Sequence, residues 1–340
     1  MLKIGISMFA VAALAMLPFL APVTTAQDGV TVVASGLNNP RSLVVTASGD
    51  VYVAEAGWGG DTTVDWVPPF GFATVGHSGR ILGFSGGETA EVLTGIQSVA
   101  LAGEEVIGVQ GLTMVGGWIY ATVGQMDVLS DGANAGSWLI RVDGEGNWEP
   151  VADLGDYERG VDPDTLGVDS NPFDVAAGPD GNLYVVDSGG NSLLQVTPTG
   201  HVSTVAAWPD NSVPTGVAFD NQGNTYVSFL SHFPFTPGTA RVERWSNGSG
   251  VVVASGLTMV TDVAVGPDGG IYVVEIATEF APNSGRILRL GSDGPQVVWD
   301  GLNYPSKIAF GDDGSLYVTN NSIGAPGSGQ VLMVEMDSEG

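Results

Sequence analysis

The amino-acid sequence predicts an all-β fold, a six-bladed β-propeller built from four-stranded blades. A unit of two short apolar strands joined by a tight turn recurs along the chain, and its second strand carries a tyrosine near its start. Six copies align on Tyr52, Tyr120, Tyr184, Tyr226, Tyr272 and Tyr317. No helical pattern of useful length follows residue 26. A β-sandwich, the alternative fold, would not repeat the same turn and tyrosine so regularly.

The clearest copy of the unit runs from residue 172 to residue 200. An apolar strand leads into the turn Pro179-Asp180-Gly181, a second strand follows at Leu183–Val186, and a glycine-rich loop precedes a third strand at Leu193–Thr197. Proline sets φ in such a turn, aspartate forms a local hydrogen bond, and glycine accepts a positive φ. The segment therefore predicts an antiparallel meander.

The other units place their strands at similar spacing. First strands are expected at Leu43–Val45, Leu112–Val115, Val175–Ala177, Val217–Phe219, Val263–Val265 and Ile308–Phe310. Second strands are expected to begin at Val51, Ile119, Leu183, Thr225, Ile271 and Leu316. Third strands are expected at Arg80–Phe84, Ser137–Val142, Leu193–Thr197, Ala240–Trp245, Arg286–Leu290 and Gln330–Met336.

The two ends of the chain are expected to share one blade. Units one to five have room for a fourth strand, but too few residues follow Met336 to make one in unit six. The segment Val30–Leu37 resembles Val251–Leu257, the predicted fourth strand of unit four. We therefore expect the N-terminal strand to complete blade six, which removes two open sheet edges.

The first residues are typical of a secretory signal peptide. Lys3 precedes the apolar run Ile4–Leu20, and the small residues Thr24–Ala26 offer a cleavage site. An uncleaved anchor is the alternative. We expect a signal peptide at 1–26, cleavage near Ala26, and a single propeller domain at 27–340 in a secreted or periplasmic protein. No later segment is apolar enough over a sufficient length to span a bilayer.

The composition limits the partners of the protein. The 340-residue chain carries 37 acidic and 10 basic residues, a formal net charge of −27, and no cysteine. Such acidity argues against nucleic acid and anionic lipid surfaces. Thiol catalysis is excluded, and stability must come from packing instead of disulfides. We expect a monomer that binds a small molecule, a glycan or a protein.

Loop lengths indicate where that ligand binds. The turns between first and second strands and between third and fourth strands are tight, whereas the other connections are long. Strand polarity puts all long loops at one end of the ring, which we call the long-loop face. Binding residues usually lie on such loops of a rigid scaffold.

Two sets of polar residues are expected near the axis at this face. The ends of the second strands carry the candidate metal ligands Glu55, Asp187, Glu275 and Asn320. Oxygen ligands of this kind suit Ca²⁺. The starts of the first strands carry the candidate ligand-binding residues Arg41, Asp174, Asp262 and Lys307. The alternative is structural: each acid caps backbone N–H groups of a neighbouring blade, or pairs with one of the two cations.

Aromatic residues form a second candidate site on the long-loop face. They are Trp58, Trp66, Phe70 and Phe72 in the loop of unit one, with Phe233 and Phe235 in unit four. His232 is the one histidine that we expect to be functional. A flat apolar site of this kind suits an aromatic or sugar-like ligand. The alternative is that these rings plug the channel mouth or pack the loops onto the ring.

The segment Asp162–Gly167 begins like a calcium-binding loop. An EF-hand also needs an acid at the fifth and twelfth positions, but the fifth is Leu166 and the twelfth is Phe173. The segment therefore fails as an EF-hand.

Several stretches resemble the secreted ScyD/ScyE family of NHL-like propellers, which is associated with scytonemin pigment clusters. They are Gly36–Arg41, Val53–Gly57, Val168–Phe173, Val186–Asn191, Val213–Gly216 and Tyr226–Gly238. The resemblance covers nearly the whole chain after the signal peptide, and unit two departs most from it. It implies the propeller fold, export and a link to scytonemin-type pigment biosynthesis, but no reaction.

The leading functional hypothesis is therefore a binding scaffold for a small aromatic molecule, a glycan or an exported partner protein. A calcium-dependent lactonase or esterase of the gluconolactonase type is the first alternative. A structural envelope protein is the second.

Overall fold

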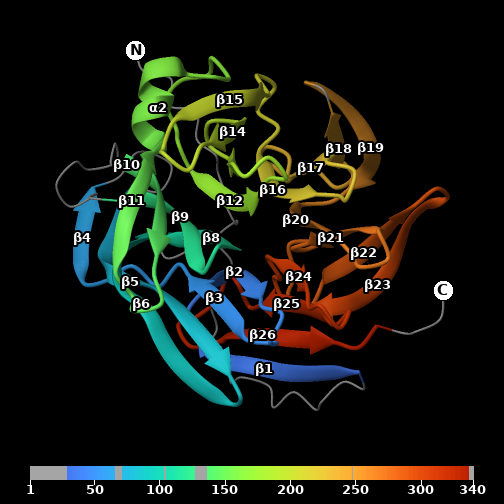
Figure 1. Ribbon diagram of the computed structural model, residues 1–340, viewed down its shortest axis with the longest axis horizontal. Helices are drawn as coiled ribbons and strands as arrows, with labels where there is room; N and C mark the ends of the chain where they lie inside the picture. Colours follow the sequence, from blue (N-terminus) through green and yellow to red (C-terminus); the bar gives the residue numbers. More distant parts are fainter. Residues whose placement is uncertain (1–28, 66–70, 103–104, 127–135, 247, 337–340) are drawn as a thin grey trace.

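Six antiparallel sheets surround a central axis in the computed structural model, which confirms the predicted six-bladed propeller (Figure 1). The structure describes residues 29–65, 71–102, 105–126, 136–246 and 248–336. The predicted signal peptide therefore lies outside the described residues. No helix among the described residues has both the length and the apolar character needed to cross a membrane.

Blades two to five take their strands in chain order from the axis outward. Blade two contains β8 (Val109–Val115), β9 (Trp118–Met126), β10 (Gly136–Val142) and β11 (Trp148–Asp153). Blade three contains β12 (Pro172–Ala177), β13 (Leu183–Asp187), β14 (Ser192–Val196) and β15 (Val202–Ala207). Blade four contains β16 (Pro214–Phe219), β17 (Thr225–Phe229), β18 (Ala240–Ser246) and β19 (Ser249–Leu257). Blade five contains β20 (Val260–Val265), β21 (Ile271–Glu275), β22 (Gly285–Gly291) and β23 (Gly294–Leu302).

Blade six is completed by the N-terminal strand, as expected. Its strands are β24 (Ile308–Phe310), β25 (Leu316–Asn320), β26 (Gly329–Val334) and β1 (Val30–Leu37). Strand β1 pairs with β26 from Val30 opposite Val334 to Leu37 opposite Gly329. Two further hydrogen bonds join the chain ends, because the N–H groups of Gly324 and Gly327 donate to Asn39 Oδ1 and Asn38 Oδ1.

The recurring tyrosine stabilises the tight turn before it. In blade three the Tyr184 hydroxyl donates to Asp180 Oδ2 at 3.0 Å, and Gly181 adopts a φ of +80°. Tyr226 donates to Asp220 and Tyr272 to Asp268 in the same way, each at 3.2 Å. The repeat in the sequence therefore reflects a repeated side-chain contact, which links the second strand to its turn.

The core lies between neighbouring blades. The faces of blades three and four, for example, bury Val186, Leu193, Val227 and Phe229 against one another, and Trp208 packs edge-on against Phe229. Burial on both faces explains why these strands read as continuous apolar runs.

Blade one is larger than the sequence predicted. Its inner strands are β2 (Pro40–Val45) and β3 (Val51–Glu55), and its outer strands are the long β5 (Phe72–Ser85) and β6 (Glu88–Leu101). The extension pairs β4 (Thr62–Asp65) with β5 and β7 (Glu105–Ile107) with β6, and buries Val75, Val99 and Ile107 in a small core of its own. Much of the predicted loop is thus extended sheet.

The described residues also contain one short helix, α2 (Leu154–Val161), where the sequence indicated none. Asp153 caps it by accepting a hydrogen bond from the Asp156 N–H at 2.7 Å. The helix lies on the long-loop face between blades two and three (Figure 1). Two turns are too short to show a helical period in the sequence.

Candidate functional site

One residue from each first strand faces the central axis. The first strands contact one another around the ring, so they are the innermost strands. The strand pairings place the axial residue opposite the fourth residue of the second strand in blades one, three, four and five, as with Asp174 opposite Val186. The corresponding residues of the six blades are Ser42, Gly111, Asp174, Gly216, Asp262 and Lys307. They lie toward the long-loop face, where these strands begin.

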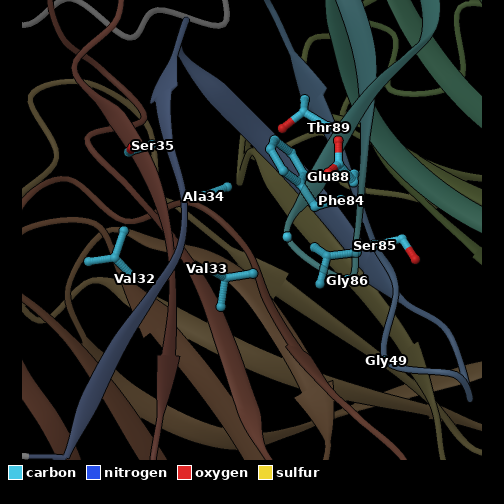
Figure 2. A pocket seen from close by; sticks show the side chains of 12 residues that line it. Val32, Val33, Ala34, Ser35, Gly49, Phe84, Ser85, Gly86, Glu88 and Thr89 are labelled. Carbon is cyan, nitrogen blue, oxygen red and sulfur yellow. The ribbon is translucent and has the colours of Figure 1, made fainter.

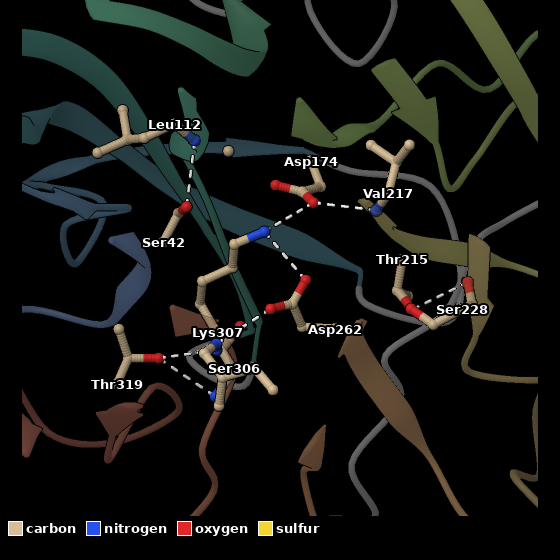
Figure 3. Close-up of polar contacts among 12 residues, drawn as sticks. Ser42, Leu112, Asp174, Thr215, Val217, Ser228, Asp262, Ser306, Lys307 and Thr319 are labelled. Atoms are coloured by element: carbon tan, nitrogen blue, oxygen red, sulfur yellow. Dashed lines mark hydrogen bonds and ion pairs between the residues drawn. The ribbon is translucent and has the colours of Figure 1, made fainter. Parts of the chain in front are cut away.

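Lys307 joins three blades at this point (Figure 3). Its Nζ donates to Asp174 Oδ2 at 2.8 Å and to Asp262 Oδ1 at 2.9 Å, which links blade six to blades three and five. The Lys307 side chain is 14 % exposed, and the two carboxylates are buried. We call Lys307, Asp174 and Asp262 the axial triad. The sequence predicted these three residues as neighbours, and the structure brings them together.

Backbone N–H groups of neighbouring blades complete the hydrogen bonds of the axial triad. Val217 N–H donates to Asp174 Oδ2 at 3.2 Å, and Ile308 N–H donates to Asp262 Oδ2 at 3.0 Å. A Cβ added at Gly216 would lie 2.8 Å from Asp262 Oδ1, so the close approach of this carboxylate requires glycine there. Asp174 Oδ1 is buried and has no hydrogen-bond partner among the described residues.

Burial and charge set the protonation of the axial triad. Burial, reinforced by the charge of Asp174, raises the pKa of Asp262 to about 7, although Lys307 acts in the opposite direction. Burial alone would lower the pKa of Lys307, but the two carboxylates outweigh it and raise this pKa above the ordinary lysine value. Lys307 therefore stays charged, and Asp262 exchanges a proton near neutral pH.

Arg41, the other expected cation, is not part of the axial triad. It stands one residue before Ser42, where the pairing of β2 with β3 shifts register between Pro40 and Ser42. Its Nη2 donates to the Val106 carbonyl at 2.8 Å, and burial lowers its pKa. Thr261 and Ser306, which hold the corresponding place in blades five and six, have buried hydroxyls without a hydrogen-bond partner among the described residues. The sequence analysis did not single out these two hydroxyls, although the same strand register identifies them.

The expected metal ligands are held apart, each within its own blade. The side chains of Glu55, Asp187, Glu275 and Asn320 accept the N–H groups of Asn38, Asn171, Thr258 and Asn303, at 2.5, 2.7, 2.6 and 2.8 Å respectively. Arg80 also pairs with Glu55, and Arg286 pairs with Glu275. These side chains therefore accept N–H groups from the segment that leads into their own blade. The structural alternative predicted N–H groups of a neighbouring blade instead.

A metal ion on the axis does not fit the residues present. The carboxylates that converge there already bind the Lys307 ammonium group, which would repel a second cation. Among the described residues, three acids approach closely enough to share an ion at one place, Glu158, Asp162 and Asp164. Glu55, Asp187, Glu275 and Asn320 do not belong to this group.

The predicted aromatic site divides into two parts on opposite blades. Trp58 and Phe72 in blade one are 46 % and 47 % exposed. In blade four, Phe233 is 50 % exposed but Phe235 is buried against Phe233 and Phe280, with ring centroids 5.9 and 5.8 Å away. Phe235 therefore packs the loop onto the ring.

Three further residues were predicted for the aromatic site. His232 is exposed, and its carbonyl accepts the Phe235 N–H at 2.9 Å. Trp66 and Phe70 lie outside the described residues.

A separate hollow of about 320 Å³ lies at the outer rim on the tight-turn side (Figure 2). It is lined by β1, including Val32 and Val33, and by the turn between β5 and β6, including Phe84. Glu88 is its one ionisable lining residue, so the hollow offers no group of acids and bases comparable to the axial triad.

Solved structures with the same architecture come from several enzymes. An oxidoreductase of the glucose dehydrogenase type from Thermus thermophilus is 20 % identical, with a TM-score of 0.63, and the match covers 90 % of this chain and 99 % of that one. An aldose sugar dehydrogenase from Streptomyces coelicolor, solved with PQQ, is 17 % identical, with a TM-score of 0.59 and coverages of 91 % and 98 %. A gluconolactonase from Xanthomonas campestris is 15 % identical, with a TM-score of 0.52 and coverages of 90 % and 97 %.

No family model and no curated protein matches the sequence. At these low identities, the likeness to solved structures shows the shared fold of a six-bladed propeller. The resemblance to the ScyD/ScyE family stays a prediction.

Proposed function

We propose that the protein hydrolyses lactones or esters of small polyhydroxylated acids at the long-loop end of its axis. The observation that carries the proposal is the axial triad, in which a charged lysine lies beside a carboxyl group that titrates near neutral pH. Asp174 Oδ1, which is buried without a hydrogen-bond partner among the described residues, could accept a hydrogen bond from a hydroxyl group of such a substrate. Sugars and a sugar lactone also appear in the names of the similar enzymes, which supports this choice of substrates for a test.

The residues of the axial triad suit both halves of the reaction. The Asp262 carboxylate takes a proton from a water molecule as its oxygen bonds to the substrate carbonyl carbon. The Lys307 ammonium group stabilises the oxyanion that forms. The oxyanion then collapses, the bond to the leaving oxygen breaks, and Asp262 returns its proton to that oxygen. Water is consumed, and a hydroxy acid, or an acid and an alcohol, is released.

Acid release from D-glucono-δ-lactone and a panel of lactones and esters tests the proposal. We expect activity to rise with pH through about 7, because Asp262 must lose its proton to act as the base. Asp262→Asn preserves size and should lower kcat by roughly 10²-fold or more. Asp293→Asn, in an exposed turn of blade five, is the matched control and should keep full activity. Equal activity in both variants, or no release from any substrate, would overturn the proposal.

A binding scaffold is the second candidate function. The half-exposed Phe233 ring, which packs edge-on against the buried Phe235, favours it, because an exposed aromatic ring suits a flat aromatic ligand such as a scytonemin-type pigment or a glycan ring. Phe233→Ala should weaken binding of an aromatic probe at least several-fold by fluorescence titration, whereas Phe72→Ala in blade one should not. Equal binding by both variants would argue against this surface.

If the chain neither releases acid nor binds an aromatic or glycan probe, these results would favour a structural role in the cell envelope. We propose export, with cleavage of the signal peptide near Ala26, for both candidate functions. The mass of the protein recovered outside the cytoplasm would show whether the mature chain begins at Gln27.

A further inference from the structure

A second acidic group lies apart from the axial triad, where α2 leads into blade three. Glu158 belongs to α2, and Asp162 and Asp164 follow directly after it. One carboxylate oxygen from each of the three lies within 4.8 Å of the others. Glu158 and Asp164 are each 1 % exposed, and Asp162 is partly buried. Three acids buried at this separation repel one another unless positive charge or protons compensate.

The Glu158 carboxylate lacks the partners that a buried charge needs. Both of its carboxylate oxygens are buried without a hydrogen-bond partner among the described residues. No ion pair neutralises it there, since Arg159, its neighbour in the helix, turns toward the exposed Asp156. An unpaired buried carboxylate costs several kcal/mol. Burial, with Asp187, Asp164, Asp162 and Asp169 adding to it, raises the pKa of Glu158 to about 8.

The backbone holds these carboxylates in place. Asp162 ends α2 in the left-handed region, with a φ of +47°, and its Oδ1 accepts the Gly167 N–H at 3.2 Å. Asp164 Oδ1 accepts the Leu166 N–H at 2.9 Å, and its Oδ2 accepts Asn191 Nδ2 at 2.9 Å. The loop is therefore organised before any ligand arrives, and Asn191 connects it to the β13–β14 loop.

The Glu158 carboxylate packs closely against the neighbouring blade. A Cβ at Gly190, in the β13–β14 loop, would lie 2.7 Å from Glu158 Oε2. The carboxylate therefore lies against bare backbone of blade three.

We propose that Glu158, Asp162 and Asp164 bind a divalent cation, calcium by their chemistry, between α2 and blade three. The ligands are all hard oxygen donors, which select Ca²⁺ or Mg²⁺ over softer metals. Three carboxylates can supply from three to six of the six to eight oxygens that Ca²⁺ takes, and water completes the shell. The loop that fails as an EF-hand thus obtains its third acid from the preceding helix, four residues upstream of Asp162.

Calorimetric titration of the full chain, freed of metal with a chelator, measures the binding directly. We expect one calcium ion per chain and a rise of several degrees in the melting temperature at millimolar calcium, because the ion binds the folded state only. Magnesium should bind more weakly, because it demands a near-ideal octahedral site.

Two variants make the test specific. Glu158→Gln keeps the side-chain size, should weaken calcium binding at least tenfold, and should melt higher than the wild type without calcium, because the amide is neutral without taking up a proton. Asp156→Asn, on the exposed side of the same helix, should bind calcium as the wild type does. The inference is overturned if the wild type gives no heat and no melting shift with 10 mM calcium or magnesium, or if Glu158→Gln binds equally well.

A further overturning outcome is that protons alone compensate the charge. The wild type would then lose stability as the pH rises through about 8 and would ignore calcium. The test is independent of the proposed hydrolysis, because it measures binding and melting and not turnover.

Discussion

Single residues near the axis could be placed from the sequence, but only some of their partners could. The starts of the first strands put Asp174, Asp262 and Lys307 near one another, and the structure joins them. Arg41 had been grouped with them but stands one residue away from the axial register, so its side chain turns toward Val106. A shift of one residue reverses the side of a strand, and this is the detail that an approximate alignment misses.

The acids at the ends of the second strands illustrate a different limit. Their equivalent positions in the repeat predicted that they bind one ion together. Each acid instead accepts the backbone N–H group at the same place of its own blade, just before the first strand. Each blade has its own copy of that N–H group, so the acids do not converge. A repeat in the sequence reports repeated local contacts more directly than it reports a shared central site.

The protonation of Asp262 should appear in the pH dependence of stability. Its pKa is about 7 when folded, above its ordinary value of 3.8, so the folded state holds this proton more tightly than the unfolded state does. Its contribution to the free energy of unfolding is present in acid and falls as the pH rises from about 4 to about 7, by at most about 1.4 kcal/mol per pH unit. Asp174 and Lys307 are the charged groups in contact with it.

Denaturant unfolding of the wild type and Asp262→Asn at several pH values isolates this contribution. The stability of the wild type relative to the variant should fall between pH 4 and 7 and level off above. A constant difference across that range would show that Asp262 ionises as an ordinary aspartate.

At the scale of elements, the strands and turns followed from the sequence because each unit carries its own signals. Gly181 and the pair of Asp180 and Tyr184 fix one hairpin without help from the rest of the chain. The extension of blade one did not follow, because its small core around Val75 and Ile107 forms between segments distant in sequence. The helix α2 could not be predicted because it is short. For the same reason, the position of Glu158 beside Asp162 could not be predicted.

At the scale of the whole molecule, the closed ring should depend on β1. Deleting residues 27–36 removes most of the partner of β26 and exposes a sheet edge. It also removes the buried Ala34 from the core shared by blades six and one. We expect the melting temperature to fall by many degrees or the deleted chain to aggregate.

A matched control for this deletion is available at the other end of the chain. Removal of residues 337–340 leaves all of β26 in place, so we expect it to change the melting temperature much less than the deletion of residues 27–36 does. A melting temperature of the 27–36 deletion close to that of the intact chain would mean that blade six does not need its outer strand.

The pairing of β1 with β26 also sets an order of events during synthesis. The strand that begins at Val30 leaves the ribosome long before its partner, which ends at Val334. Blade six therefore cannot close until all six blades have been synthesised. The entropy of closing so long a loop must be overcome in a late step. Until then β1 is an unpaired strand that could pair wrongly, and a helper protein or a delay in folding would protect it.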